Sequence, residues 1–325
     1  MAQTVVRKKH GKGFTYRYAS GKTVKSKALR QWFASLVIPP AWQDVEINLD
    51  RDAKIHVTGR DEKQRKQYIY NQAWTEAAEK TKFKRILRFG SQLETMRRVT
   101  GQHLLQRPVD ANAVLACMTR MMDEAFFRPG SPEYTRANGT HGLTTLRDRH
   151  LTFTDEGAEF IYTGKSGKEQ HRWIRNDSVC EVLAELESMT GYELFDVTLP
   201  DGERRQFSAG DLNDYITEVM GEDFSAKDFR TWAGTVLMAV ALEQQGACQN
   251  KKQNQSNIVQ AVKSVAEKLG NTPAVCRASY IHPEVILQYE CGKTLAHFRR
   301  QLKKLKQQLM SEEEYATLAL LQKAE

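Results

Sequence analysis

Residues 151–174, LTFTDEGAEFIYTGKSGKEQHRWI, decide the fold class, because they interrupt a long helical stretch with a clear β pattern. Apolar and polar residues alternate on either side of the turns DEG and GKSGK. Alternation with a period of two is typical of strands that bury one face. Three such runs separated by two short turns predict a three-stranded antiparallel meander, with Lys165 at its second turn.

Helical periodicity surrounds this meander. Apolar residues recur three and four positions apart in five segments, which are 73–105, 111–127, 177–189, 229–245 and 256–270. This spacing indicates amphipathic helices. Gly270 is expected to end the last of them as a C-cap, and Thr272 followed by Pro273 predicts the N-cap and first residue of another helix.

The first 80 residues are predicted to form short strands and turns instead. The segment FTYRYASGKTV at 14–24 alternates aromatic and polar residues, and AKIHVTGRDEKQRKQYIY at 53–70 has the pattern of a hairpin. Alternation places Tyr68 and Tyr70 on one face, where they would either contact a ligand or pack a core. Basic and polar residues lie close by in the sequence, namely Arg60, Lys63, Arg65, Lys66 and Gln67.

Together these patterns predict an α+β protein. A small β-rich domain at residues 1–80 precedes a mostly α-helical domain at residues 81–325, and the second domain contains the meander. The five cysteines form no CxxC pair and are odd in number, which favours reduced and mostly buried thiols over a disulfide or zinc framework.

The net charge of +8 is concentrated at the N-terminus. Residues 1–90 hold 20 Lys and Arg against 8 Asp and Glu, whereas the rest of the chain holds 28 against 32. A polyanion such as nucleic acid is the natural partner of this excess, because each neutralised phosphate releases condensed counterions. The alternative is a basic surface that serves solubility alone. The sequence predicts no membrane span and no signal peptide, and therefore a cytoplasmic protein.

The sequence lacks the motifs of nucleotide-binding proteins and of metal-dependent enzymes. Three GK[ST] tripeptides occur, but the glycine that a phosphate-binding P-loop needs five residues earlier is Tyr16, Glu159 or Leu287. The eight histidines show no HxH or HExxH spacing, and Asp50 and Asp52 have no second carboxylate cluster downstream. The sequence therefore predicts no nucleotide site, no metal site and no cofactor.

Four segments of the helical domain contain residues suited to phosphoryl transfer. They are AFFRPGSPEYTRANGTHGLTTLRDRH (125–150), YTGKSGKEQ (162–170), AKDFRTWAGTVL (226–237) and LGNTPAVCRASYIHP (269–283). In this order they resemble the catalytic motifs of type IB DNA topoisomerases of the small bacterial and poxviral kind. The segments VIPPAW (37–42), GRDEKQRKQYIY (59–70) and KFKRILRFG (82–90) are similar to the DNA-clamping part of the same family, so the resemblance covers nearly the whole chain.

The resemblance implies a set of catalytic residues. Arg128 and Arg230 would be the two catalytic arginines, Lys165 the lysine of the hairpin, and Tyr280 the nucleophile that cuts one DNA strand. Asn271 stands where viral and eukaryotic members have histidine, and it would donate an N–H to a phosphate oxygen without a charge. Lys168, Arg277 and His282 are neighbours without an assigned step.

The residue types suit this chemistry on physical grounds. Arginine offers a planar fork of donors and keeps its charge, so two arginines can neutralise a phosphoryl group between two oxygens. A lysine whose pKa is lowered by nearby cations can protonate the leaving 5′-oxygen. Each arginine could instead be a structural ion-pair partner, and the tyrosine a packed residue.

The family also implies double-stranded DNA as the partner and the nucleoid as the place of action. We expect a monomer, because a clamp made of two domains in one chain can encircle DNA alone. The expected DNA contacts are Arg65, Lys66, Gln67, Tyr68 and Tyr70 in the N-terminal domain, and Tyr134 and Arg136 in the helical one. Two other hypotheses remain open at this point. A tyrosine recombinase would share the Arg-Lys-Arg-Tyr chemistry, and an architectural DNA-binding protein would share only the basic surface.

Overall fold

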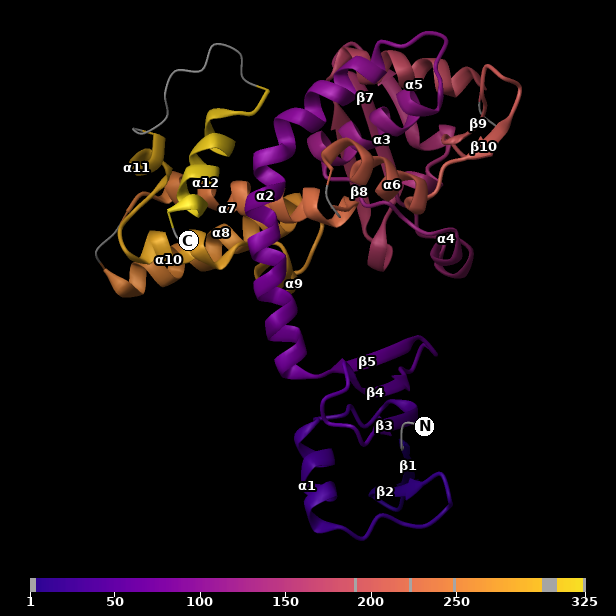
Figure 1. Ribbon diagram of the computed structural model, residues 1–325, viewed down its shortest axis with the longest axis vertical. Coiled ribbons are helices and arrows are strands. Elements are labelled where there is room, and N and C mark those ends of the chain that lie inside the picture. Colours follow the sequence, from indigo (N-terminus) through magenta and orange to yellow (C-terminus); the bar gives the residue numbers. More distant parts are fainter. Residues whose placement is uncertain (1–3, 190–191, 222–223, 248–249, 300–308, 324–325) are drawn as a thin grey trace. The chain divides into compact units, whose positions relative to one another are not determined.

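The computed structural model describes residues 4–189, 192–221, 224–247, 250–299 and 309–323 (Figure 1). The chain divides into two compact units, Met1–Lys84 and Arg85–Glu325, which we call the N-terminal and C-terminal units. The 33-residue helix α2, Gln72–Leu104, runs through the boundary between them. The structure confirms the predicted α+β class, with an antiparallel sheet first and a mostly helical part after it.

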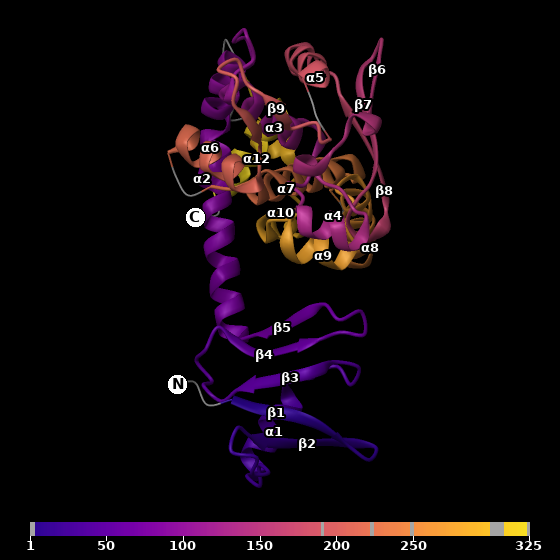
Figure 2. The same ribbon diagram turned by 90° about the vertical axis from the view of Figure 1, so that its right-hand side faces the viewer.

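The N-terminal unit is built on a five-stranded sheet in the order β2-β1-β3-β4-β5, which can be followed in Figure 2. All four pairings are antiparallel. The strands are β1 Thr4–His10, β2 Gly13–Tyr18, β3 Gln43–Asn48, β4 Ile55–Arg60 and β5 Lys66–Tyr70. Buried Val5, Ile47 and Val57 form the centre of a small core of its own beneath this sheet.

One helix of this unit was not expected from the sequence. Helix α1, Lys27–Ser35, lies within the stretch that was predicted to hold only strands and turns. The Ser26 side chain accepts a hydrogen bond from the Leu29 backbone N–H and caps the helix, and Phe33 is buried in the core of the sheet. Leu29, Trp32 and Phe33 have helical spacing and pack in or against this core, but the helix is only nine residues long, which is too short for periodicity alone to identify it.

The C-terminal unit surrounds helix α3, Ala111–Ala125, in which ten residues are buried. This helix packs against α5 Asp177–Met189, α6 Ala209–Met220, α7 Ala226–Gln245 and strand β8 Glu169–Ile174. The remaining helices are α4 Pro132–Asn138, α8 Lys251–Lys268, α9 Pro273–Ser279, α10 Pro283–Glu290, α11 Leu295–Arg299 and α12 Glu312–Gln322. Two short strands, β9 Asp196–Thr198 and β10 Arg204–Gln206, pair separately.

The predicted meander is present as β6 Leu151–Thr154, β7 Gly157–Thr163 and β8 Glu169–Ile174, antiparallel in that order. Its inner face buries Ala158, Phe160 and Tyr162. Phe127 packs against it, with ring centroids 5.3 Å from Phe160 and 5.8 Å from Tyr162. The sheet is therefore fixed to the loop that follows α3.

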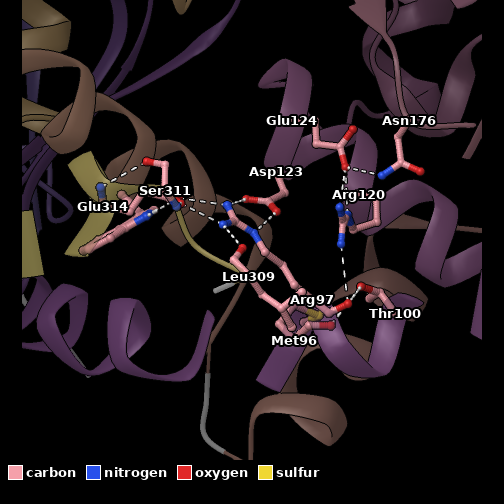
Figure 3. A network of polar contacts seen from close by, with 11 residues as sticks. Met96, Arg97, Thr100, Arg120, Asp123, Glu124, Asn176, Leu309, Ser311 and Glu314 are labelled. Atoms are coloured by element: carbon pink, nitrogen blue, oxygen red, sulfur yellow. Dashed lines mark hydrogen bonds and ion pairs between the residues drawn. The ribbon is translucent and has the colours of Figure 1, made fainter. Parts of the chain in front are cut away.

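A buried ionic network fixes helix α12 to the rest of the unit (Figure 3). Arg97 of α2 donates to both oxygens of Asp123, at 2.7 and 2.9 Å, and to both oxygens of Glu314, at 2.7 and 2.8 Å. Glu314 also caps α12 through Ser311 and accepts a hydrogen bond from the Trp232 indole of α7. Two bidentate contacts satisfy the guanidinium, which offsets the cost of removing three charges from water.

Within the described residues, no helix is long and apolar enough to cross a membrane.

We expect Arg97→Leu to lower the free energy of unfolding by about 3–5 kcal/mol, because it leaves two buried carboxylates without their counter-charge. Urea denaturation measures this change. The matched control is Arg204→Leu, which removes an exposed arginine from its pair with Asp196 and should cost less than about 1 kcal/mol. Equal losses in the two variants would contradict a special contribution from Arg97.

Candidate active site

The C-terminal end of helix α8 gathers three arginines from three different elements. Arg172 of β8 donates to the Lys268 carbonyl oxygen at 2.7 Å, Arg230 of α7 to that of Leu269 at 2.6 Å, and Arg128 to that of Gly270 at 2.9 Å. Carbonyl groups at a helix C-terminus have no partner within the helix and carry partial negative charge. They hold the guanidinium groups without cancelling the positive charge.

Arg128 is positioned by the loop that follows α3. That helix ends at Phe126, which adopts a left-handed conformation with φ of 58°. The Arg128 carbonyl accepts a hydrogen bond from the Leu143 N–H at 2.7 Å, which anchors its backbone. The Phe126 carbonyl in turn accepts a hydrogen bond from Arg230, so one loop supports both arginines.

Arg230 lies in the first turns of α7 and is only 3% exposed. A capping box begins the helix, in which the Asp228 carboxylate accepts the Ser225 N–H at 2.9 Å. Asp228 also pairs with Arg85 at 2.8 Å. Burial and the nearby Arg128 charge lower the pKa of Arg230 to about 10. The unpaired positive charge therefore strains this site, and an anion beside it would relieve the strain.

A cavity lies next to these arginines. Its lining residues are Phe126, Arg128, His141, Tyr162, Gly164, Lys165, Gln170, Arg172, Arg230 and Leu269. Four of these side chains are basic at neutral pH and none is acidic. Within the described part of the chain, neither Arg128 nor Arg230 has a carboxylate partner, which contradicts the alternative that they are structural ion pairs.

Lys165 reaches the cavity from the turn between β7 and β8, in a short helical turn at Lys165–Gly167. Lys168 lies in the same exposed turn but is not among the residues that line the cavity. The sequence analysis named Lys165 as the candidate and left Lys168 without an assigned step, and of the two it is Lys165 that lines the cavity.

Tyr280 is the residue that follows helix α9 and caps its C-terminus. As expected, Thr272 is the N-cap of this helix and Pro273 its first residue. The Arg230 guanidinium carbon lies 5.3 Å from the Tyr280 ring centroid, and the two side chains also share a hydrogen bond. A partly buried phenol thus lies against the most deeply buried of the arginines.

Asn271 adjoins the same cluster, because its Oδ1 accepts a hydrogen bond from Arg128 at 2.5 Å. Its Nδ2 is buried and has no hydrogen-bond partner among the described residues, and the same is true of the Arg230 Nε. Two donors without acceptors beside a basic cavity are suited to the oxygens of a phosphate group.

The structure therefore brings together the five candidates Arg128, Lys165, Arg230, Asn271 and Tyr280. Arg277 and His282, the other neighbours of Tyr280 in the sequence, belong to the adjacent helices α9 and α10. Arg277 is exposed on α9, and His282 is the N-cap of α10, where its Nδ1 accepts the Glu284 N–H. Tyr134 and Arg136 are exposed on the short helix α4.

The candidate DNA contacts of the N-terminal unit lie on β5 and, for Arg65, directly before it. Tyr68 and Tyr70 are 41% and 44% exposed with ring centroids 6.0 Å apart, so they share a face and do not pack the core. Lys66 lies over the Tyr68 ring at 5.6 Å. Arg65 and Gln67 both hydrogen bond the Asp61 carboxylate, which orders the strand end.

Sequence reasoning missed residues in both units. Trp74, at the start of α2, stacks on Tyr70 with centroids 5.8 Å apart and is covered by Lys54 at 4.2 Å. Arg172 and His141 line the cavity. The alternation of β8 places Arg172 on the same face as Gln170, but its contact with Lys268 joins distant residues, and nothing in the sequence pattern signals His141.

A nucleophilic tyrosine candidate among arginines and a lysine, in a helical unit with a three-stranded sheet, is the arrangement of enzymes that transfer DNA phosphoryl groups to tyrosine. The comparisons with known proteins identify the family within this class. Residues 71–309 match the family model of the eukaryotic DNA topoisomerase I catalytic core, and residues 13–61 match that of the bacterial DNA topoisomerase IB N-terminal domain. The chain belongs to the type IB DNA topoisomerases.

Individual relatives agree with this assignment. The chain is 30% identical to the DNA topoisomerase 1B of Acanthamoeba polyphaga mimivirus over 96% of its own length and 98% of the relative. It is 24% identical to the DNA topoisomerase 1B of Vaccinia virus, strains Copenhagen and Western Reserve, over 37% of its length and 38% of each relative. The family assignment replaces the recombinase and architectural hypotheses.

Gly234 of α7 allows the backbone of Tyr280 to approach closely. A Cβ atom at Gly234 would lie 2.5 Å from the Tyr280 carbonyl oxygen and 3.0 Å from its Cβ. We expect Gly234→Ala to displace Tyr280 and slow plasmid relaxation by more than about tenfold, since small misplacements of reacting groups are costly.

The control for this substitution is Gly101→Ala in helix α2, where a Cβ would meet nothing within 4 Å. It should stabilise the helix by about 0.5–1 kcal/mol and leave relaxation unchanged. Unaltered relaxation by Gly234→Ala would show that the phenol does not depend on this contact.

Proposed function

We propose that this chain relaxes supercoiled double-stranded DNA by cutting and resealing one strand through Tyr280. Membership of the type IB topoisomerases supports the reaction. The observation that carries the residue assignment is the contact of Tyr280 with Arg230, beside a cavity that Arg128 and Lys165 also line. The proposal concerns one site, in the C-terminal unit.

In the proposed reaction, the Tyr280 oxygen attacks a backbone phosphorus and forms a 3′-phosphotyrosyl ester while the bond to the 5′-oxygen breaks. Tyr280 loses its proton to solvent, and Lys165 donates one to the departing 5′-oxygen, because an alkoxide is a poor leaving group. Arg128 and Arg230 stabilise the negative charge that develops on the phosphoryl oxygens. Asn271 would donate its unpartnered Nδ2 to one of these oxygens.

Resealing follows the same path in reverse. The ester retains the free energy of the broken phosphodiester, so the 5′-hydroxyl can attack it without ATP. While the strand is open, the free end can rotate about the intact strand, and the torsion of the DNA drives relaxation. We expect activity in EDTA, because guanidinium groups, and not a metal ion, supply the charge stabilisation in this proposal.

DNA binding is the proposed role of the basic N-terminal unit. The excess of lysine and arginine in residues 1–90 supports an electrostatic contact with the phosphate backbone. The exposed aromatic face formed by Tyr68, Tyr70 and Trp74, with Lys54 and Lys66 beside it, supports a contact surface of the same unit. We propose that the protein acts as a monomer, in the cytoplasm at the nucleoid.

The test is relaxation of negatively supercoiled plasmid in EDTA without ATP, followed on an agarose gel. We expect the wild-type chain to yield a ladder of relaxed circles and Tyr280→Phe to yield none, because phenylalanine has no oxygen to form the ester. Tyr289→Phe, which alters a buried tyrosine of α10, is the control. Relaxation by Tyr280→Phe would refute the assignment of the nucleophile.

The aromatic face is tested by DNA affinity. We expect the double change Tyr70→Ala and Trp74→Ala to raise the Kd for a duplex about tenfold, equivalent to about 1.4 kcal/mol. Fluorescence anisotropy with a labelled duplex at fixed salt measures it. Phe153→Ala, which removes an exposed aromatic side chain of β6, should leave the Kd unchanged. An equal effect of all these changes would argue against a specific contact.

A further inference from the structure

Arg172 connects the hairpin that carries Lys165 to the end of helix α8. Its Nη1 donates to the Lys268 carbonyl at 2.7 Å, and its Nη2 donates to the Gln170 Oε1 at 2.8 Å. It also forms a hydrogen bond with the Tyr162 side chain. One guanidinium therefore joins strands β7 and β8 to the segment that leads into Asn271.

The turn that bears Lys165 depends on this connection. Its residues 165–168 are all exposed, so packing gives the turn little support. Gln170 supplies the contact, because its Nε2 donates to the Glu169 carbonyl at 3.1 Å and to that of Lys168 at 3.5 Å. The Gly164 N–H also donates to the Lys168 carbonyl, at 2.8 Å. Hydrogen bonds thus run from Arg172 through Gln170 to the base of the turn.

The backbone at the end of α8 also approaches Gln170 and Arg172 closely. Gly270 has φ of +64°, and a Cβ atom there would lie 2.7 Å from the Gln170 Oε1 and 3.3 Å from the Arg172 Nη2. The glycine lets the hairpin and the α8 terminus approach to this distance. Asn271 and Arg128 join this terminus through the hydrogen bonds described above.

A purely structural arginine would be expected to have an acidic partner. Within the described residues, Arg172 has only carbonyl, amide and phenol partners, and it lines the cavity with three other cations. Burial lowers its pKa, and the charge of Arg128 lowers it further. Keeping a fourth cation here is unfavourable in the absence of an anion, which points to a role in the reaction.

We propose that Arg172 is a positioning residue that holds Lys165 in reach of the departing 5′-oxygen, while Arg128 and Asn271 hold the same phosphate. This inference rests on the proposed function. In the cleavage step, the bond between the Tyr280 oxygen and phosphorus forms, the bond to the 5′-oxygen breaks, and that oxygen takes a proton from Lys165. During resealing, the 5′-hydroxyl returns its proton to Lys165. Arg172 touches neither reacting oxygen and acts through the geometry of the turn.

The readout is the dependence of cleavage on the leaving group. A DNA substrate can carry a 5′-bridging sulfur in place of the scissile oxygen, and the thiolate leaves without protonation because its proton affinity is far lower. Loss of the general acid, or of its correct position, should therefore slow cleavage of the oxygen substrate and leave cleavage of the sulfur substrate nearly unchanged. Single-turnover cleavage of a nicked duplex that releases its short 5′-product measures both rates.

We expect Arg172→Ala to slow cleavage of the oxygen substrate by roughly 100-fold, the lower range for a lost general acid, and that of the sulfur substrate by less than about threefold. Lys165→Ala should give the same pattern. Arg172→Lys should fall between the wild type and Arg172→Ala, because an ammonium keeps the charge but does not span both partners. Arg175→Ala, which removes an exposed arginine just beyond β8, should alter neither rate.

Equal losses of cleavage rate on both substrates would overturn the proposal. They would indicate that Arg172 stabilises the charge on the phosphate or the fold of the unit, and does not act through Lys165. Unchanged rates on both would overturn it as well. If Arg172→Ala does not fold, Gln170→Ala breaks the same connection from the hairpin side and takes the same test. A failure of the proposed function would look different from a failure of this inference. In that case the wild type would not cleave DNA, or the loss of cleavage rate in Lys165→Ala would be the same for the oxygen and the sulfur substrate.

Discussion

The arrangement of the site depends on the three carbonyl groups at the C-terminal end of helix α8. They hold the guanidinium groups of Arg128, Arg172 and Arg230, which come from a loop, a strand and a helix far apart in the sequence. Carboxylates in their place would bind more tightly but would cancel the charge. Carbonyl dipoles fix the direction of each donor and leave most of the positive charge available for a phosphate.

Much of this organisation was predictable from the sequence, because it depends on local patterns. Alternation predicted the β6-β7-β8 meander, and Thr272 with Pro273 predicted the start of α9. The positions of Arg172 and Trp74 were not predicted, since their contacts join distant residues or depend on how a helix begins beside a strand. The carbonyl partners of the arginines have no sequence signal either, because every residue carries a carbonyl group.

The two units differ in where they place their charged side chains. The N-terminal unit has a small core of its own and exposes aromatic rings with lysines over their faces. The C-terminal unit buries charge. Away from the candidate site, Asp228 pairs with Arg85, and Arg97 pairs with Asp123 and Glu314, whereas the buried Arg230 is held by carbonyl oxygens. Long-range attraction to a polyanion suits the first arrangement, and accurate placement of reacting groups suits the second.

Helix α7 carries Arg230 and, one turn later, the glycine against which the backbone of Tyr280 rests. The phenol and its guanidinium neighbour thus both rest on the same helix. In the proposed reaction, a tilt of this helix under the torque of the DNA would move both groups together and preserve their separation. The geometry needed to reseal the strand would then survive motions that would disturb a site assembled from independent loops.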